Sequence, residues 1–127
     1  MGEVLFSDEI QKFIQGSIPS LEALEILFFL YQYPEKSFSV ETVLKEIQSS
    51  PKSVSLRLIQ LQDKGLIIET ERNHYQFSPR SLDLREKVEQ LKACYVAYRL
   101  KVIEVIYLPA SDGIQSFSDA FQFKKGN

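Results

Sequence analysis

The side chains best suited to chemistry in this 127-residue chain are a single histidine and a single cysteine. His74 could shuttle a proton, but it stands beside a predicted hairpin turn with no serine or cysteine nucleophile next to it. Cys94 falls in the middle of a predicted helix, where a packed thiol is the ordinary interpretation. One cysteine and one histidine cannot supply the four ligands of a zinc site. The sequence therefore predicts no enzyme, no metal centre and no cofactor.

Length and composition predict one soluble globular domain, since 44% of the residues are hydrophobic and 25% are charged. The densest apolar run, Ile26 to Tyr31, is far shorter than the roughly 20 residues of a membrane span. A single cysteine and the lack of an evident signal peptide favour the cytoplasm. Residues 1–50 hold three Lys and Arg against eight Asp and Glu, whereas residues 51–80 hold five against three. The middle of the chain is therefore its mildly basic part.

The segment from Phe38 to Phe77 carries a connected series of helix, turn and strand signals. Ser39 can cap a short helix, and Ser50 followed by Pro51 can start a second one that runs to about residue 64. Gly65 is expected to end the second helix in a left-handed conformation. β-rich segments follow at residues 66–70 and 74–78, around a turn in which Asn73 can adopt a positive φ. The order predicts two helices and then a β-hairpin.

This order of signals resembles the winged helix-turn-helix transcriptional regulators of the MarR and ArsR type, over about Ser20 to Ser78. The resemblance implies a supporting helix over residues 39–48, a recognition helix over about 50–64 and a wing over about 66–78. In such regulators the recognition helix enters the major groove of double-stranded DNA, and the wing reaches the backbone or the minor groove. The implied function is a DNA-binding transcriptional regulator.

By the same resemblance, the outward residues of the recognition helix and the wing tip are expected at the DNA. Lys52 and Ser53 suit phosphate contacts, while Arg57 and Gln60 could read the edges of guanine or adenine. The full expected set is Lys52, Ser53, Ser55, Leu56, Arg57, Gln60, Arg72, Asn73 and His74.

Two apolar residues on the expected recognition helix support an alternative function. Leu56 could contact a thymine methyl group, but Ile59 offers nothing obvious to DNA. The alternative is a winged-helix protein-interaction module that does not bind DNA and presents Leu56 and Ile59 to a protein partner.

A long helix is predicted after the hairpin, beginning at Ser81 or Asp83 and ending at Pro109. Apolar residues recur along it at spacings of four and three, which is typical of a coiled-coil seam. From Leu100 onward the helix is apolar on nearly every side, so it should need a partner beyond its own domain. The sequence therefore predicts a homodimer whose interface contains Leu84, Val88, Leu91, Tyr95, Tyr98, Val102 and Val105.

Two helices are expected before Phe38, one from Ser7 or Asp8 to about Gln15 and a largely apolar one after Ser20. At the other end, Ile114, Phe117, Phe121 and Phe123 are enough apolar residues for the tail to dock back. The predicted fold class is mainly α with a small β-hairpin wing, made of a winged helix-turn-helix over residues 1–80 and a long dimerisation helix with its tail over 81–127.

Overall fold

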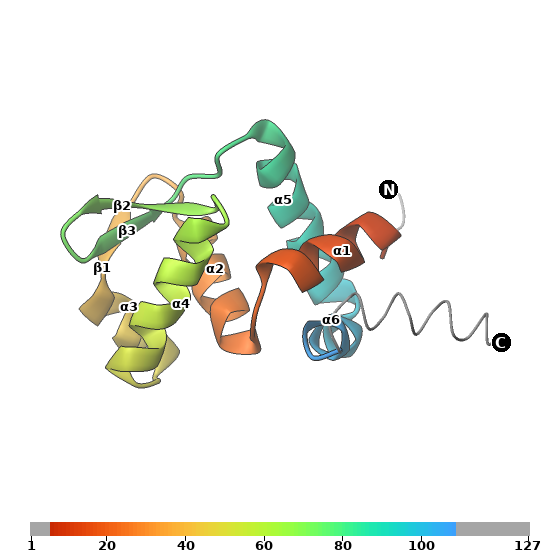
Figure 1. Cartoon of the computed structure of the whole chain (residues 1–127), viewed down its shortest axis with the longest axis horizontal. Helices are drawn as coiled ribbons and strands as arrows, with labels where there is room; N and C mark the ends of the chain where they lie inside the picture. Colours follow the sequence, from red (N-terminus) through yellow and green to blue (C-terminus); the bar gives the residue numbers. More distant parts are fainter. Residues whose placement is uncertain (1–5, 109–127) are drawn as a thin grey trace, which may run out of the picture.

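The computed structural model describes residues 6–108, which form six helices and a small antiparallel sheet (Figure 1). In chain order the elements are α1 (Asp8–Ser17), α2 (Leu21–Gln32), β1 (Ser37–Ser39), α3 (Val40–Ile47), α4 (Pro51–Asp63), β2 (Ile67–Glu71), β3 (His74–Phe77), α5 (Leu82–Ala97) and α6 (Arg99–Ile106). The expectation of a mainly helical chain with a small β element is confirmed. The tail beyond residue 108, with its four predicted docking residues, lies outside the described part.

Serine side chains begin most of these helices. In each case the hydroxyl oxygen accepts a hydrogen bond from a backbone N–H in the first helical turn, which is worth about 1 kcal/mol per cap. The serines concerned are Ser7, Ser20, Ser39, Ser50 and Ser81. The predicted starts are therefore confirmed, with Ser7 and Ser81 chosen where two caps were possible. At the other end of α1 the prediction was two residues short, because the helix runs through Gly16 to Ser17.

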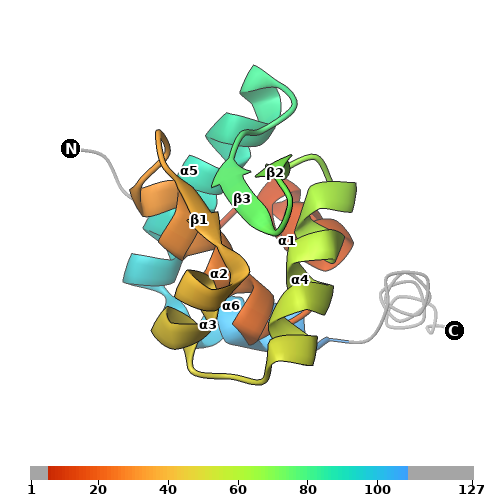
Figure 2. The same ribbon diagram turned by 90° about the vertical axis from the view of Figure 1, so that its left-hand side faces the viewer.

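The sheet has three strands in the order β1-β3-β2, although only the β2–β3 hairpin was predicted. Figure 2 shows the three strands beside α3 and α4. Phe38, directly before the Ser39 cap, lies in β1 opposite Tyr75 of β3. A three-residue strand is too short to show alternation, so the sequence pattern could not reveal it.

The two predicted left-handed positions around the hairpin are confirmed. Gly65 has a φ of +78° after α4, and Asn73 has a φ of +62° in the turn between β2 and β3. A register shift between Glu69 and Glu71 marks a bulge in β2 just before this turn.

Helix α2 lies at the centre of the molecule and is buried on most of its sides. Leu24, Ile26, Leu27 and Leu30 have no accessible surface, as its nearly uniform apolar sequence predicted. In Figure 1 the elements α3, α4 and the sheet lie on one side of α2, and α1, α5 and α6 lie on the other. One core therefore joins both groups.

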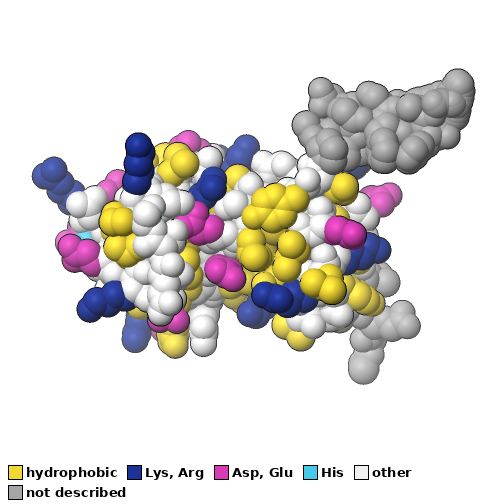
Figure 3. Space-filling view, turned by 90° about the horizontal axis from the view of Figure 1, so that it is seen from below, with side chains coloured by type: hydrophobic (Ala, Val, Ile, Leu, Met, Phe, Trp, Pro, Cys, Tyr) yellow, Lys and Arg dark blue, Asp and Glu magenta, His cyan; other side chains and the backbone are white. Residues whose placement is uncertain are grey.

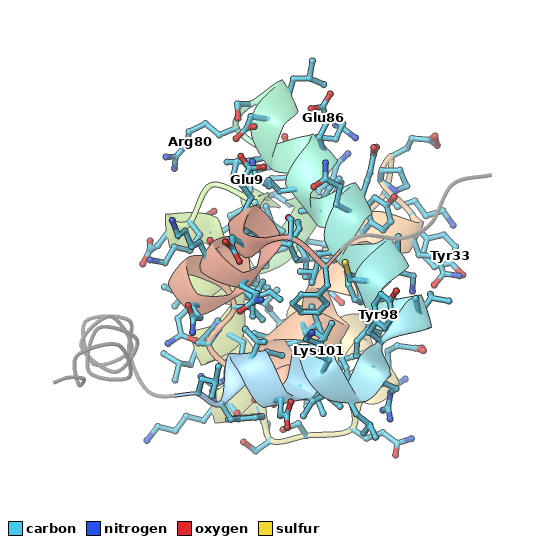
Figure 4. The ribbon with its side chains drawn as sticks, turned by 90° about the vertical axis from the view of Figure 1, so that its right-hand side faces the viewer. Glu9, Tyr33, Arg80, Glu86, Tyr98 and Lys101 are labelled. Atoms are coloured by element: carbon cyan, nitrogen blue, oxygen red, sulfur yellow. The ribbon has the colours of Figure 1, made fainter. Side chains whose placement is uncertain are left out.

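The single helix predicted between Ser81 and Pro109 is wrong. The chain breaks at Tyr98, whose φ and ψ are −136° and 55°, so that α6 turns back and packs on α1 and α5 (Figure 4). A straight helix would leave the apolar side chains of 102–106 in water, whereas the break lets Val102, Val105 and Ile106 enter the core.

Four of the seven residues of the predicted dimer seam cannot form an interface between copies. Its central residues are buried in the core of this chain and have no surface to offer to a second copy: Val88, Leu91, Val102 and Val105. Leu84 and Tyr95 are half-buried against the same core, and Tyr98 stands at the helix break. The spacing of three and four was an intramolecular core pattern and not a coiled coil.

Between residues 6 and 108, no single helix is long and apolar enough to cross a membrane. Helices α1 and α2 reach that length and composition only together, and they meet at 103°.

The two glycines near helix ends should respond in opposite ways to alanine. An alanine at position 65 would have to keep the left-handed backbone conformation, and its Cβ would lie 2.9 Å from the Arg80 guanidinium carbon, so Gly65→Ala should cost about 1–2 kcal/mol. Gly16 has open space and no unusual φ, so Gly16→Ala should stabilise α1 by about 0.5–1 kcal/mol. Urea denaturation of both variants tests this contrast, and equal effects would contradict it.

Candidate nucleic-acid interface

Helix α4 presents a mixed face to solvent. Val54, Leu58 and Leu61 have no accessible surface and fix the inward side of the helix. The opposite side follows spacings of four, three and four, so its members share one face: Lys52, Leu56, Ile59 and Asp63. Leu56 and Ile59 are each 48% exposed. We call these four residues the outer face of α4; it carries one cation, one anion and two aliphatic side chains.

The β2–β3 turn lies beside the first turns of α3 and α4. The backbone N–H of Val40 donates to the carbonyl oxygen of Asn73 at 2.9 Å, which attaches the turn to the start of α3. A groove of about 520 Å³ opens where the three elements meet. It is lined by Ser39, Val40, Glu41, Leu44, Pro51, Ser55, Arg72, Asn73 and His74. We call it the turn groove; it brings together one predicted contact residue of α4 and all three of the hairpin tip.

Local hydrogen bonds organise the hairpin tip. The Asn73 N–H donates to Glu69 Oε2 at 2.9 Å, and His74 Nδ1 lies 2.9 Å from the carbonyl oxygen of Arg72. His74 Nδ1 is also 3.9 Å from Glu71 Oε2. Arg72 is exposed at the tip, so it is the cation that the hairpin offers to a partner.

Arg57 does not point outward, contrary to the expectation of a base-reading residue. Its Nε donates to Glu22 Oε1 of α2 at 3.1 Å, and its Nη1 donates to Gln60 Oε1 at 3.1 Å. The Ser53 hydroxyl donates to the same Glu22 oxygen at 2.6 Å. Two of the predicted DNA contacts, Ser53 and Arg57, thus hold α4 against α2, and a third, Gln60, is bound to the Arg57 guanidinium.

The environment of Glu22 favours its charged form. Burial alone would raise the pKa of Glu22, but hydrogen bonds from Ser49, Ser53 and Arg57, together with the Arg57 charge, outweigh it and lower the pKa. The Glu22 side chain is 18% exposed and that of Arg57 is 24% exposed. This pair is therefore partly shielded from water and stronger than an ordinary surface ion pair.

The position of Glu22 in the first turn of α2 indicates by itself only a favourable interaction with the dipole of that helix. Its partners lie 31 and 35 residues away along the chain. No local spacing rule connects positions so far apart, so the sequence held no signal for this cluster.

The charges around the turn groove and the outer face of α4 are mixed. Lys52 and Arg72 are the cations that stand near the expected binding surface. Carboxylates stand close by on all three elements, at Glu41, Asp63, Glu69 and Glu71. This balance agrees with the weak basic excess of residues 51–80 and is lower than the basic excess of most DNA-binding faces.

The two side chains first considered for chemistry have ordinary surroundings. Cys94 is buried, and burial raises the pKa of its thiol, which keeps it in the unreactive protonated form. Across residues 6–108 no three His, Cys, Asp or Glu side chains are grouped as a metal site.

Comparison with known proteins returned no matching family model, no matching curated protein and no matching solved structure.

Replacing Glu22 by glutamine should destabilise the protein in a pH-dependent way. Because the folded pKa lies below the ordinary value of about 4.5, the carboxylate stabilises the fold fully above that pH and loses this effect as the pH falls through the folded pKa. We expect Glu22→Gln to cost about 1–2 kcal/mol at neutral pH, and the difference from the wild type to shrink in acid.

Urea denaturation at neutral and acid pH measures both quantities for Glu22→Gln. Glu25→Gln is the matched control, since Glu25 is exposed on the same helix and should change stability by less than about 0.5 kcal/mol. A cost for Glu22→Gln that does not vary with pH would contradict the role of the carboxylate charge.

Proposed function

We propose that residues 20–78 form a winged helix-turn-helix and that the protein binds double-stranded DNA as a transcriptional regulator. The observation that carries this proposal is the turn groove, where the start of α4 and the tip of the β2–β3 hairpin meet on one side of the molecule. A recognition helix and a wing have to share one side in order to touch one duplex.

The order of elements supports the fold assignment. A helix, a short strand, two helices and a hairpin follow one another in α2, β1, α3, α4, β2 and β3, and the short strand pairs with the hairpin. The presence of β1 strengthens the resemblance, because the short strand attaches the hairpin to the helical part of the unit.

In this proposal, α4 enters the major groove through its first two turns, and the hairpin tip lies over the adjacent backbone. Lys52 and Arg72 contact phosphates, and Ser55, Asn73 and His74 supply neutral hydrogen-bonding groups. Arg57 has no base-reading role here, because its guanidinium is bound to Glu22 and Gln60.

The homodimer remains part of the proposal, since two recognition helices would address two half-sites and double the phosphate contacts. The buried residues of the predicted seam cannot supply its interface. Cytoplasmic location is likewise proposed and follows from the proposed function.

Substitution of the two cations should weaken DNA binding through the loss of phosphate contacts. Lys52→Ala and Arg72→Ala should each lower the affinity for duplex DNA and each reduce the slope of log affinity against log salt by about one. Lys12→Ala is the matched control, because Lys12 is an exposed lysine on α1, outside the winged unit, and should leave both quantities unchanged.

Fluorescence anisotropy at several salt concentrations measures these effects, with light scattering of the complex to count the copies bound. The proposal fails if the wild-type protein shows no affinity for duplex DNA at low salt. A complex that holds one copy would remove the homodimer and leave DNA binding in place.

A second function is favoured by one specific observation, the half exposure of Leu56 and Ile59 on the outer face of α4. Exposed aliphatic side chains at the centre of a binding surface suit a protein partner better than a phosphate backbone. In this alternative the winged helix-turn-helix is a protein-interaction module, and α4 is its contact helix.

The double substitution Leu56→Glu, Ile59→Glu tests whether a protein partner binds the outer face of α4. If a protein partner binds α4, a photo-crosslinking residue placed at position 63, on the same outer face, should give a discrete adduct with one protein in the native lysate. The two glutamates should abolish that adduct, while Lys52→Ala should keep it. An adduct that survives both glutamates would rule out this alternative.

A further inference from the structure

Exposed hydrophobic side chains are concentrated at the end of the described chain. Residues 6–108 contain ten large hydrophobic side chains that are exposed, and five of them fall within residues 96–108. They are Val96, Tyr98, Leu100, Tyr107 and Leu108. Figure 3, which views the molecule from the side on which α6 lies, shows hydrophobic side chains gathered there. A cluster of this kind is typical of a surface that interacts with a partner or with another segment of the chain.

Helix α6 has a second apolar stripe besides the one that it buries. Val102, Val105 and Ile106 face the core, whereas Leu100, Ile103 and Tyr107 recur at spacings of three and four along a different side. Leu100 is 76% exposed and Tyr107 is 61% exposed, although the Tyr107 hydroxyl accepts a hydrogen bond from the Leu21 N–H at 3.0 Å. We call Leu100, Ile103 and Tyr107 the outer stripe of α6.

The sequence that follows α6 has a complementary pattern. Ile114, Phe117 and Phe121 recur at spacings of three and four, so in a helix they would share one side. The opposite side of such a helix carries the polar residues Ser116 and Asp119, and its one large apolar residue is Phe123 at the end of the segment. Residues 114–121 would therefore have one apolar side that could match the outer stripe.

Chain length allows this match within one molecule. The described chain ends at Leu108, next to the outer stripe, and the five residues 109–113 can span up to about 17 Å. The eight residues of α6 are about 12 Å long, so a segment that starts at Ile114 can reach any part of the outer stripe. Pro109 and Gly113 in the connection are typical turn residues.

We propose that residues 114–123 pack on the outer stripe of α6 in the same molecule, with Phe117 and Phe121 as the principal contacts. A second copy is the competing occupant of this surface. A segment on a five-residue connection has an effective concentration in the millimolar range, which is about a thousandfold above a second copy at micromolar concentration. The covered stripe is independent of the proposed DNA binding and would exist with either function.

The protein contains no tryptophan, so Phe117→Trp introduces a unique fluorescent reporter. We expect its emission to be blue-shifted and poorly quenched by acrylamide, as for a covered indole. Adding Leu100→Lys should shift the emission to the red and raise quenching several-fold. Leu82→Lys is the matched control, because Leu82 is 69% exposed at the far end of α5 and should change neither property.

Three outcomes would overturn the proposal. The first is a solvent-exposed emission spectrum for Phe117→Trp alone, and the second is a spectrum that Leu100→Lys does not change. The third is a blue shift that grows with protein concentration, which would assign the outer stripe to a second copy.

Hydrogen exchange of residues 99–108 in the full chain provides a second measurement. The variant Phe117→Ser, Phe121→Ser should raise exchange there several-fold while leaving α2 protected. The variant Ser116→Ala, Asp119→Ala, on the opposite side of the segment, should not. Equal exchange in both variants would also overturn the proposal.

Discussion

The structure depends on one constraint, which is that α2 has to be covered on nearly all of its sides. Its fully buried residues lie around most of the helix, so neither the sheet side nor the α5 side alone could remove them from water. The short helices α1 and α6 and the longer α5 close one side, and α3, α4 and the sheet close the other. The break at Tyr98 lets α6 pack on α1 and α5 and add Val102, Val105 and Ile106 to the same core.

The polar part of α2 has an equally large effect on the candidate interface. Glu22 stands at the start of the central helix, and it needs hydrogen-bond donors to offset its partial burial. Ser53 and Arg57 of α4 supply them. The buried side chains of Val54, Leu58 and Leu61 set the rotation of α4. That rotation brings both donors to Glu22 and presents Leu56 and Ile59 outward. The exposure of these two aliphatic side chains is thus a consequence of the way in which α4 packs on the core.

Local features of the fold could be predicted from sequence, because their physical causes are local. Ser20, Ser39 and Ser50 mark helix starts through hydrogen bonds that span three residues, and Gly65 and Asn73 mark left-handed positions through their own conformational preferences. β1 was not predictable, since its three residues become a strand only by pairing with β3. The spacing of three and four between apolar residues of 84–105 shows that one side of the chain there has to be covered. The spacing does not say whether the surface that covers it belongs to the same chain.

The same distinction applies to the candidate interface. The outward position of Lys52 and the place of Arg72 at the hairpin tip follow from helix and turn geometry. The inward position of Arg57 does not, because it is set by Glu22 on an element far away in the sequence. An arginine at the right spacing on a recognition helix is therefore a base-reading candidate only when no carboxylate of the supporting core lies within its reach.

The first turn of α4 sets a further limit on how DNA could be held. Pro51 has no N–H, the Ser53 N–H is bound by the Ser50 hydroxyl, and the Val54 N–H is bound by the Ser50 carbonyl oxygen. In this turn only the Lys52 N–H is left to meet a phosphate, beside its own ammonium group. Lys52 thus supplies both the remaining N–H of the helix terminus and the ammonium group beside it. Arg72 adds the second cation from the hairpin. With carboxylates at Glu41, Glu69 and Glu71 around them, these two cations would favour a partner that approaches in one defined orientation over nonspecific attraction to the phosphate backbone.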